Sequence, residues 1–352
     1  MRGASHPKTS VKLPHPRGAL SDALTDLLNS PAARPSTARL DLVARGTRAA
    51  DAGDPLHDED LQLALYVMYE LSYRGFAGVD DEWEWDPELL RTRAVLESAY
   101  LAALRESVVV PDDVPADRSA VAAALFAMTA PTPGPSLARF VAKRATVDQA
   151  REFLVHRSIY QLKEADPHSW AIPRLEGRAK AALVEIQADE YGGGAPERMH
   201  AELFARTMRG VGLDAHYGAY IEQVPAVTLA GVNLMSLLGL HRRWRGAIVG
   251  HLAAFEMTSC VPNRRYGDGL RRLGFGPDAL AYFDEHVEAD AVHEAVAAND
   301  LAGSLVAAEP ELEDDVLFGA RALCVVEATF AERLIAAWRA GRSSLLEPPI
   351  AA

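Results

Sequence analysis

The stretch FDEHVEADAVHEAV, residues 283–296, places three groups that could bind a metal on a segment with helical periodicity. His286, Asp290 and His293 are separated by four and three residues, and these steps return to one face of a helix. Phe283 indicates that the same face turns toward an apolar core. Two imidazoles and a carboxylate that point inward predict either a ligand-binding site or a hydrogen-bonded structural network.

Further carboxylates and one more imidazole come earlier in the chain. Thr146 with the glutamine three residues later predicts a capping box that opens a helix, and Glu164 lies near the end of that helix. Glu190 follows, and then Glu197 and His200, which share a face if their segment is helical. Each residue alone is more often structural, because short carboxylate and histidine patterns arise by chance. Their number in one chain favours a common site.

A metal pair would balance the charge of such a site. Carboxylates gathered in a dry helical core cost several kcal/mol of desolvation, on the order expected for buried ions, unless positive charge accompanies them. Two divalent ions would balance the four candidate carboxylates, which are Glu164, Glu190, Glu197 and Asp290. Only Cys260 and Cys324 could supply thiolates, and no C-x-x-C motif is present. Carboxylates with imidazoles suit iron or manganese and argue against structural zinc.

Nearly the whole chain has a helical period. Residues 58–76 and 314–338 both repeat apolar side chains on one face, and alternating strand patterns are scarce, so we expect an all-α fold. TAPTPGPS at 129–136 is the one Pro-rich interruption. The expected organisation is a mobile tail at 1–20, an N-terminal helical segment at 21–128, a linker at 129–137 and a core at 138–345.

Composition limits the class of protein. The 352 residues carry a formal net charge of −13, so the basic field of a nucleic-acid-binding protein is absent. The start of the chain lacks the apolar run of a signal peptide, and the longest uncharged stretch, 224–240, is too short to span a membrane. We expect a cytoplasmic protein that contacts neither nucleic acid nor membrane. We also expect a homodimer that uses part of the N-terminal helical segment.

The pattern His-x-x-x-Asp-x-x-His, preceded by Glu-x-x-His and by a single glutamate, resembles the haem-oxygenase-like di-iron oxidases and oxygenases, a family also described as iron-containing redox enzymes. The resemblance covers about residues 140–345 and includes DEYGGG, the run VTLAGVNLMSLLGLHRRWRGAIVGHLAAFEMTS, and RRYGDGLRRLGFG. It implies a haem-oxygenase-like helical bundle that binds two iron ions, uses O₂ and contains no haem. The family's six metal ligands match, in order, Glu164, Glu197, His200, His286, Asp290 and His293.

The resemblance leaves the reaction open, because members of the family oxidise many substrates. Glu190 is an additional carboxylate that looks like one found in members that oxidise amine nitrogen, so we expect N-oxygenation of an amino acid or small amine in secondary metabolism. An external electron donor would then be a partner. The alternatives are desaturation, oxidative decarboxylation or C–C cleavage of an amino or fatty acid, and a non-catalytic metal-binding protein.

Three other features have weaker functional interpretations. Arg264 and Arg265 could bind a substrate carboxylate, although a solvated basic face is the more common role of such residues. Glu327 could form a hydrogen bond with a metal ligand. YGGGAP is not followed by Gly-Lys-Ser/Thr, so it is not a phosphate loop, and we expect a flexible break in a ligand-bearing segment.

Overall fold

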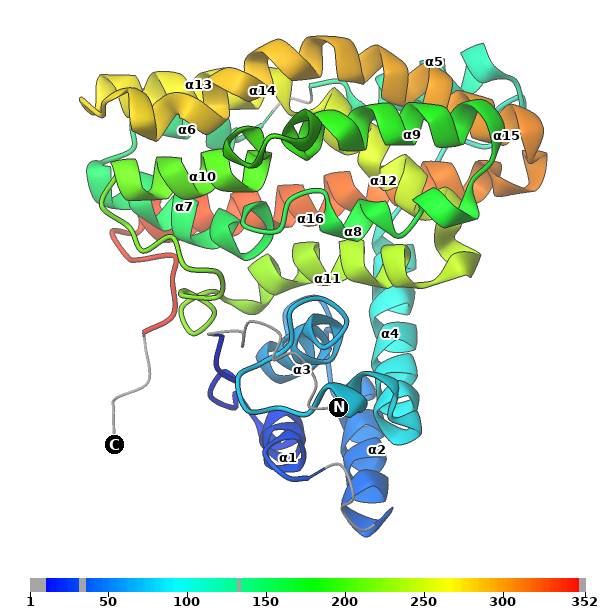
Figure 1. The fold of residues 1–352 in the computed structure, drawn as a ribbon, viewed down its shortest axis with the longest axis vertical. Helices are drawn as coiled ribbons and strands as arrows, with labels where there is room; N and C mark the ends of the chain where they lie inside the picture. The colour runs from blue at the N-terminus through cyan, green and yellow to red at the C-terminus, as the bar shows by residue number, and fades with distance from the viewer. Residues whose placement is uncertain (1–10, 32–35, 132–133, 348–352) are drawn as a thin grey trace, which may run out of the picture. The chain divides into compact units, whose positions relative to one another are not determined.

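The structure is a computed structural model that describes residues 11–31, 36–131 and 134–347. Inside two of its helices, the side chains of residue 36 and of residues 288–292 lie outside this description. The described residues form helices and connecting turns without any strand, which confirms the predicted all-α class (Figure 1). No helix in this part of the chain is long and apolar enough to cross a membrane.

The chain divides into two compact units. Unit 1 contains residues up to Glu106, residues Gly218–Asn233 and the C-terminal residues from Leu346; unit 2 contains Ser107–Tyr217 and Leu234–Leu345. Four boundaries separate them: at the end of α4 (Pro87–Ser107), after Tyr217, inside α11 (Ala226–Leu240) and after Leu345.

Unit 1 is built around α3, a helix buried on all sides. Asp58 caps its first turn by accepting a hydrogen bond from Leu61 N at 2.8 Å. Leu61 and Leu65 are fully buried, and a helix that is apolar all round must lie inside a core. The helices of this unit, with α4 and the first half of α11, are α1 (Ala19–Leu28), α2 (Ser36–Ala50), α3 (Glu59–Glu70) and η1 (Asp81–Trp85).

The predicted mobile tail is only partly covered by the structure. Residues 1–10 lie outside the described residues. Val11 and Leu20 are buried, and Val11 O accepts a hydrogen bond from Ala77 N at 2.7 Å. Val11, Pro14 and Leu20 therefore anchor this stretch in unit 1 through buried apolar side chains, while the residues between them are exposed or half-buried.

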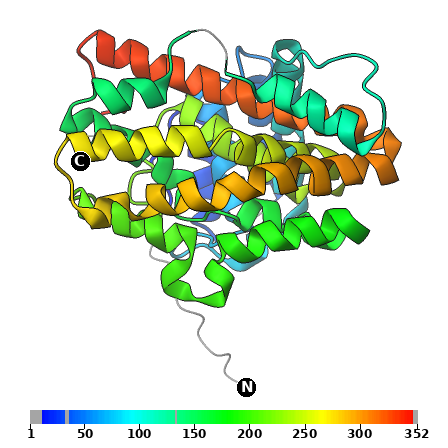
Figure 2. The same cartoon turned by 90° about the horizontal axis from the view of Figure 1, so that it is seen from above.

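Unit 2 holds nine further α-helices of seven or more residues in the described part of the chain, several of which run side by side in Figure 2. They are α5 (Arg118–Thr129), α6 (Leu137–Lys143), α7 (Val147–Gln161), α9 (Gly177–Glu190), α10 (His200–Gly210), α12 (Arg245–Met257), α13 (Cys260–Arg272), α14 (Pro277–Ala295) and α16 (Glu313–Arg339). Shorter elements complete the unit: α8 (Asp166–Ser169), η2 (Ile172–Arg174), η3 (Gly192–Gly194), η4 (Pro196–Arg198), η5 (Arg242–Trp244), the π-helix η6 (Val296–Gly303), α15 (Ser304–Ala308) and η7 (Pro310–Leu312).

The centre of unit 2 is the close pair of α12 and α16. A Cβ atom added to Gly250 would lie 1.8 Å from Val316 O, and one added to Gly319 would lie 1.9 Å from Ala247 O. Only glycine permits this approach of the two backbones. The helix α12 is buried from Gly246 to Ala254 and at Glu256, so the polar side chains of His251 and Glu256 lie inside the unit.

The contact pattern departs from the predicted domain boundaries at α5. The sequence placed this helix in the N-terminal segment, before the Pro-rich linker, but α5 belongs to unit 2. The reason is its apolar face, on which Val121 and Leu125 are fully buried, since α5 packs against α12, α16 and η6.

Candidate metal centre

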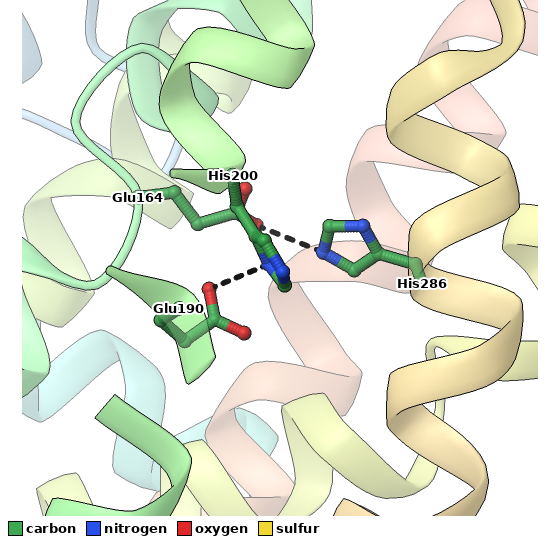
Figure 3. Close-up of side chains that lie close together, drawn as sticks. All are labelled: Glu164, Glu190, His200 and His286. Atoms are coloured by element: carbon green, nitrogen blue, oxygen red, sulfur yellow. Dashed lines mark ion pairs between the residues drawn. The ribbon is translucent and has the colours of Figure 1, made fainter. Parts of the chain in front are cut away.

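Four buried side chains from separate parts of unit 2 point toward one another (Figure 3). Glu164 lies in the turn after α7, Glu190 is the last residue of α9, His200 is the first residue of α10, and His286 lies on α14. One ligand atom of each lies within 4.8 Å of the ligand atoms of the others. This group has the donors and the spacing to surround a single ion.

A second group lies beside the first and shares one residue with it. Glu190, Glu256 on α12 and His293 on α14 are all buried, and their ligand atoms also lie within 4.8 Å of one another. His293 Nδ1 is 3.5 Å from Glu256 Oε2. The two groups therefore form one candidate metal centre with Glu190 as the common member.

A left-handed turn directs Glu164. The helix that Thr146 opens has the predicted capping box, but it ends at Gln161 and does not continue to Ala165. Ala165 has φ +74°, a region that costs a non-glycine residue on the order of 1–3 kcal/mol. Tyr282 Oη donates to Glu164 Oε1 at 2.6 Å, whereas Glu164 Oε2 is buried and accepts no hydrogen bond within the described residues. The second oxygen is left for a cation.

The glycine turn brings His200 to Glu190. Gly192, Gly193 and Gly194 all have positive φ, so the chain reverses sharply between α9 and α10. His200 Nδ1 lies 3.1 Å from Glu190 Oε2, out of line for a hydrogen bond. The expected break in YGGGAP is thus a turn of defined conformation that connects two candidate ligands.

Hydrogen bonds fix the imidazole rings of α14. His286 Nδ1 lies 2.8 Å from Tyr282 O, and because a carbonyl only accepts, Nδ1 carries the proton. Its Nε2 then offers a lone pair on the side of Glu164, whose Oε1 is 3.7 Å away. Imidazoles that bind metals commonly donate their other N–H in this way.

The electrostatics also correspond to a site that attracts cations. Burial opposes charge on His200, but the Glu190 carboxylate outweighs it and raises the pKa of His200. Burial likewise opposes charge on His293, yet Glu256 and Asp189 raise its pKa to about 9. Burial raises the pKa of Glu256, although His293 acts in the opposite direction. A metal ion could replace these protons as the source of positive charge.

The donor set fits iron. Three buried carboxylates and three imidazoles, with no thiolate among them, are the hard and intermediate ligands that iron and manganese prefer. Glu164 Oε2, His200 Nδ1 and His293 Nδ1 are buried atoms without a hydrogen-bond partner in the described part of the chain. Buried polar atoms are rarely left so, and one ion in each group would account for all three.

The structure does not bring Glu197 to the other candidate ligands, and its role as a metal ligand stays a prediction. This residue is exposed in η4 and belongs to neither group. The expected Glu-x-x-His face needs a continuous helix, but Pro196 opens a separate 3-10 turn and α10 begins only at His200. The backbone of Asp290 is part of α14, and its side chain lies outside the described residues.

Glu256 is the residue that the sequence interpretation missed. It ends the apolar stretch GHLAAFE, and a carboxylate on a helix that is apolar on every side is a signal that could have found it. No spacing rule connects it to His293, because α12 and α14 are brought together only by the fold.

The weaker predictions lie away from both groups. Arg264 is exposed and Arg265 half-buried on α13, and neither lines the cavity at the metal centre. Glu327 pairs with Arg157 through two hydrogen bonds of 2.7 and 2.6 Å, which gives it a structural partner.

A cavity opens beside the candidate ligands. Its wall includes no lysine or arginine among the described residues. The lining residues are Tyr160, Glu164, Ala165, His168, Gln187, Glu190, Leu252, Phe255, Glu256, Ser259 and His286.

Two comparisons with known proteins agree with this site. A family model described as iron-containing redox enzyme matches residues 151–328, which contain every member of both groups. The nitrosourea synthase of Streptomyces achromogenes subsp. streptozoticus is 31% identical over 160 residues, which are 45% of this chain and 34% of that protein. The chain thus spans about a third of the length of this relative. Because the family model matches half of this chain, the chain belongs to the iron-containing redox enzymes.

Proposed function

We propose that this chain is an O₂-dependent non-haem di-iron oxygenase that oxidises the nitrogen of an amino acid or small amine. The observation that carries the proposal is the pair of buried groups that share Glu190. A single structural ion would need only one of them, and two ions a few ångströms apart are the usual arrangement in carboxylate-rich helical proteins that react with O₂.

Each group would hold one iron. Glu164, Glu190, His200 and His286 would supply one ion, and Glu190 with Glu256 and His293 the other. When bound, the iron pair would supply electrons that reduce O₂, and O₂ would supply the oxygen atom that is added to the substrate. The chain's part is to hold the ligands in place, through Tyr282 and Asp189, and to exclude water with the apolar wall of Leu252 and Phe255.

Two observations favour nitrogen as the atom that is oxidised. The first is the name of the relative, which states a product whose nitroso group is attached to nitrogen. The second is Glu190, which belongs to both groups and looks like the additional carboxylate of family members that oxidise amine nitrogen. Desaturation, oxidative decarboxylation or C–C cleavage of an amino or fatty acid is the second candidate.

The test is anaerobic loading with Fe(II), followed by exposure to isotopically labelled O₂ in the presence of single amino acids and amines and an external reductant. We expect two irons per chain and a product that contains labelled oxygen on nitrogen. A product that lacks labelled oxygen but has lost hydrogen or CO₂ would support the second candidate. Accumulation of ferric ion without any product would support a metal-binding protein that is not an enzyme.

A further inference from the structure

Gln187 has an unusual environment in the wall of the cavity. It lies on α9, three residues before Glu190, and its side chain is 3% exposed. Its Nε2 donates to Ala165 O at 2.9 Å and to Ser169 Oγ at 2.7 Å. Its Oε1 is buried and has no hydrogen-bond partner among the described residues. One half of the amide is thus fully engaged while the other half is left without a partner.

The surrounding groups prevent the amide from turning over. Ala165 O only accepts hydrogen bonds, so the atom that faces it must be the NH₂ group. Ser169 Oγ has a single proton, which goes either to Ala165 O at 3.2 Å or to Tyr191 Oη at 2.9 Å, so this oxygen also accepts from Gln187. Tyr191 in turn donates to Asp166 Oδ1 at 2.9 Å. The network therefore fixes the orientation of the amide, so the buried atom without a partner is the acceptor Oε1.

We propose that Gln187 Oε1 accepts a hydrogen bond from an N–H group of the substrate, so that Gln187 determines specificity for an amine, amide or guanidine. The proposal rests on the proposed function, since it concerns the molecule that the oxygenase binds. A buried carbonyl without a partner is unfavourable, and a donor from the ligand removes that cost. Positions three apart share a helix face, so a nitrogen bound by Gln187 would lie beside Glu190 and the metal centre.

The side chain at position 187 is a glutamine amide and not a carboxylate, which suits an amine substrate that must react through its lone pair. A carboxylate at this position would stabilise the protonated ammonium form, which has no lone pair. The neutral amide accepts an N–H without adding negative charge. The side chain therefore binds nitrogen while leaving it nucleophilic.

The experiment compares two probes that differ only in the N–H group. N-propylacetamide and propyl acetate are both neutral, and oxygen replaces N–H in the ester. Each is titrated into the full chain loaded anaerobically with Fe(II), and its dissociation constant is obtained from the rise of the thermal midpoint with probe concentration. We expect the wild-type protein to bind the amide about tenfold more tightly than the ester, the effect of one neutral hydrogen bond.

Gln187→Met keeps the length of the side chain and should remove this preference, so that the amide and the ester bind about equally. Gln161→Met is the matched control, because Gln161 is also buried with an unpaired Oε1 but does not line the cavity, and it should keep the tenfold preference. Equal binding of the two probes by the wild-type protein would overturn the proposal even if neither variant folds, as would a preference that Gln187→Met retains. The titration involves no turnover, so absence of N-oxygenation in the labelling experiment would count against the proposed function alone.

Discussion

Asp189 holds His293 through the ring nitrogen that faces away from the candidate metal centre. His293 Nε2 lies 2.9 Å from Asp189 Oδ2, and this leaves Nδ1 on the side of Glu256, 3.5 Å from Oε2. The carboxylate thereby sets both the orientation of the ring and the nitrogen that is available to a metal. Asp189 directly precedes Glu190, so α9 contributes to the site twice. Glu190 is a candidate ligand, and Asp189 orients the candidate ligand His293.

Asp189→Ala should weaken iron binding by about tenfold or more, because supporting hydrogen bonds to metal-bound imidazoles commonly have effects of 10–100-fold. The dissociation constant for Fe(II), measured anaerobically with a competing chelator, checks this. Glu185→Ala changes an exposed carboxylate on the same helix and should leave the constant unchanged. If the two variants bind iron equally well, Asp189 does not support the site.

Glu256→Gln and Glu197→Gln distinguish the ligand set of the structure from that of the sequence. Glu256 is buried in the second group and Glu197 is exposed, so only the first substitution should lower the iron content, from about two ions per chain to about one. Elemental analysis after gel filtration provides the measurement, with circular dichroism to show that both variants are folded. Loss of iron from Glu197→Gln alone would restore the Glu-x-x-His interpretation.

Gly192→Ala should disrupt the turn between two of the ligands. A Cβ atom at Gly192 would lie 2.6 Å from both Arg198 C and Met199 N, and its φ is +66°. Gly193 has φ +61° but open space around it, so Gly193→Ala should cost only the left-handed conformation, on the order of 1–2 kcal/mol. Urea denaturation should show the larger loss for Gly192→Ala, together with reduced iron binding because His200 is displaced. Similar losses in both variants would mean that the backbone contact at Gly192 is unimportant.

Acid should destabilise the protein partly through His156. This residue is buried, with Nε2 3.0 Å from Ser344 Oγ, and burial, followed by the charges of Arg157 and Arg333, lowers its pKa to about 3. The unfolded chain therefore binds a proton that the folded chain does not between about pH 6.5 and pH 3. The contribution of His156 to the free energy of unfolding is fully present above pH 6.5 and is lost as the pH decreases through this range.

His156→Gln removes one of these protons, so the slope of the free energy of unfolding against pH should decrease by about 1.4 kcal/mol per unit between pH 6 and pH 4. Urea titrations of the metal-free protein at several pH values measure this slope. His216→Gln, at a side chain that is 83% exposed, should leave it unchanged. Parallel curves for the wild-type protein and His156→Gln would contradict the prediction.

Local patterns allowed part of this molecule to be predicted. The capping box at Thr146 and the helical class follow from side chains close in sequence, and the structure confirms both. The sequence also named Glu164, Glu190, His200 and His286, and the structure brings them together, although their binding of metal stays a prediction.

Glu256 could not be connected to His293, because the contact between α12 and α14 depends on how the unit packs. Glu197 lies outside both groups for the opposite reason. A short motif was assumed to be helical where Pro196 and the glycines impose turns.

Glu190 belongs to both groups, and this has a consequence for how the centre assembles. An ion bound at either position would use a carboxylate that the other position also needs. Occupancy of the two positions is therefore linked, and the loading curve should deviate from that of two independent sites. Substitution of Glu190 should abolish both steps of that curve at once, whereas Glu256→Gln should remove only one.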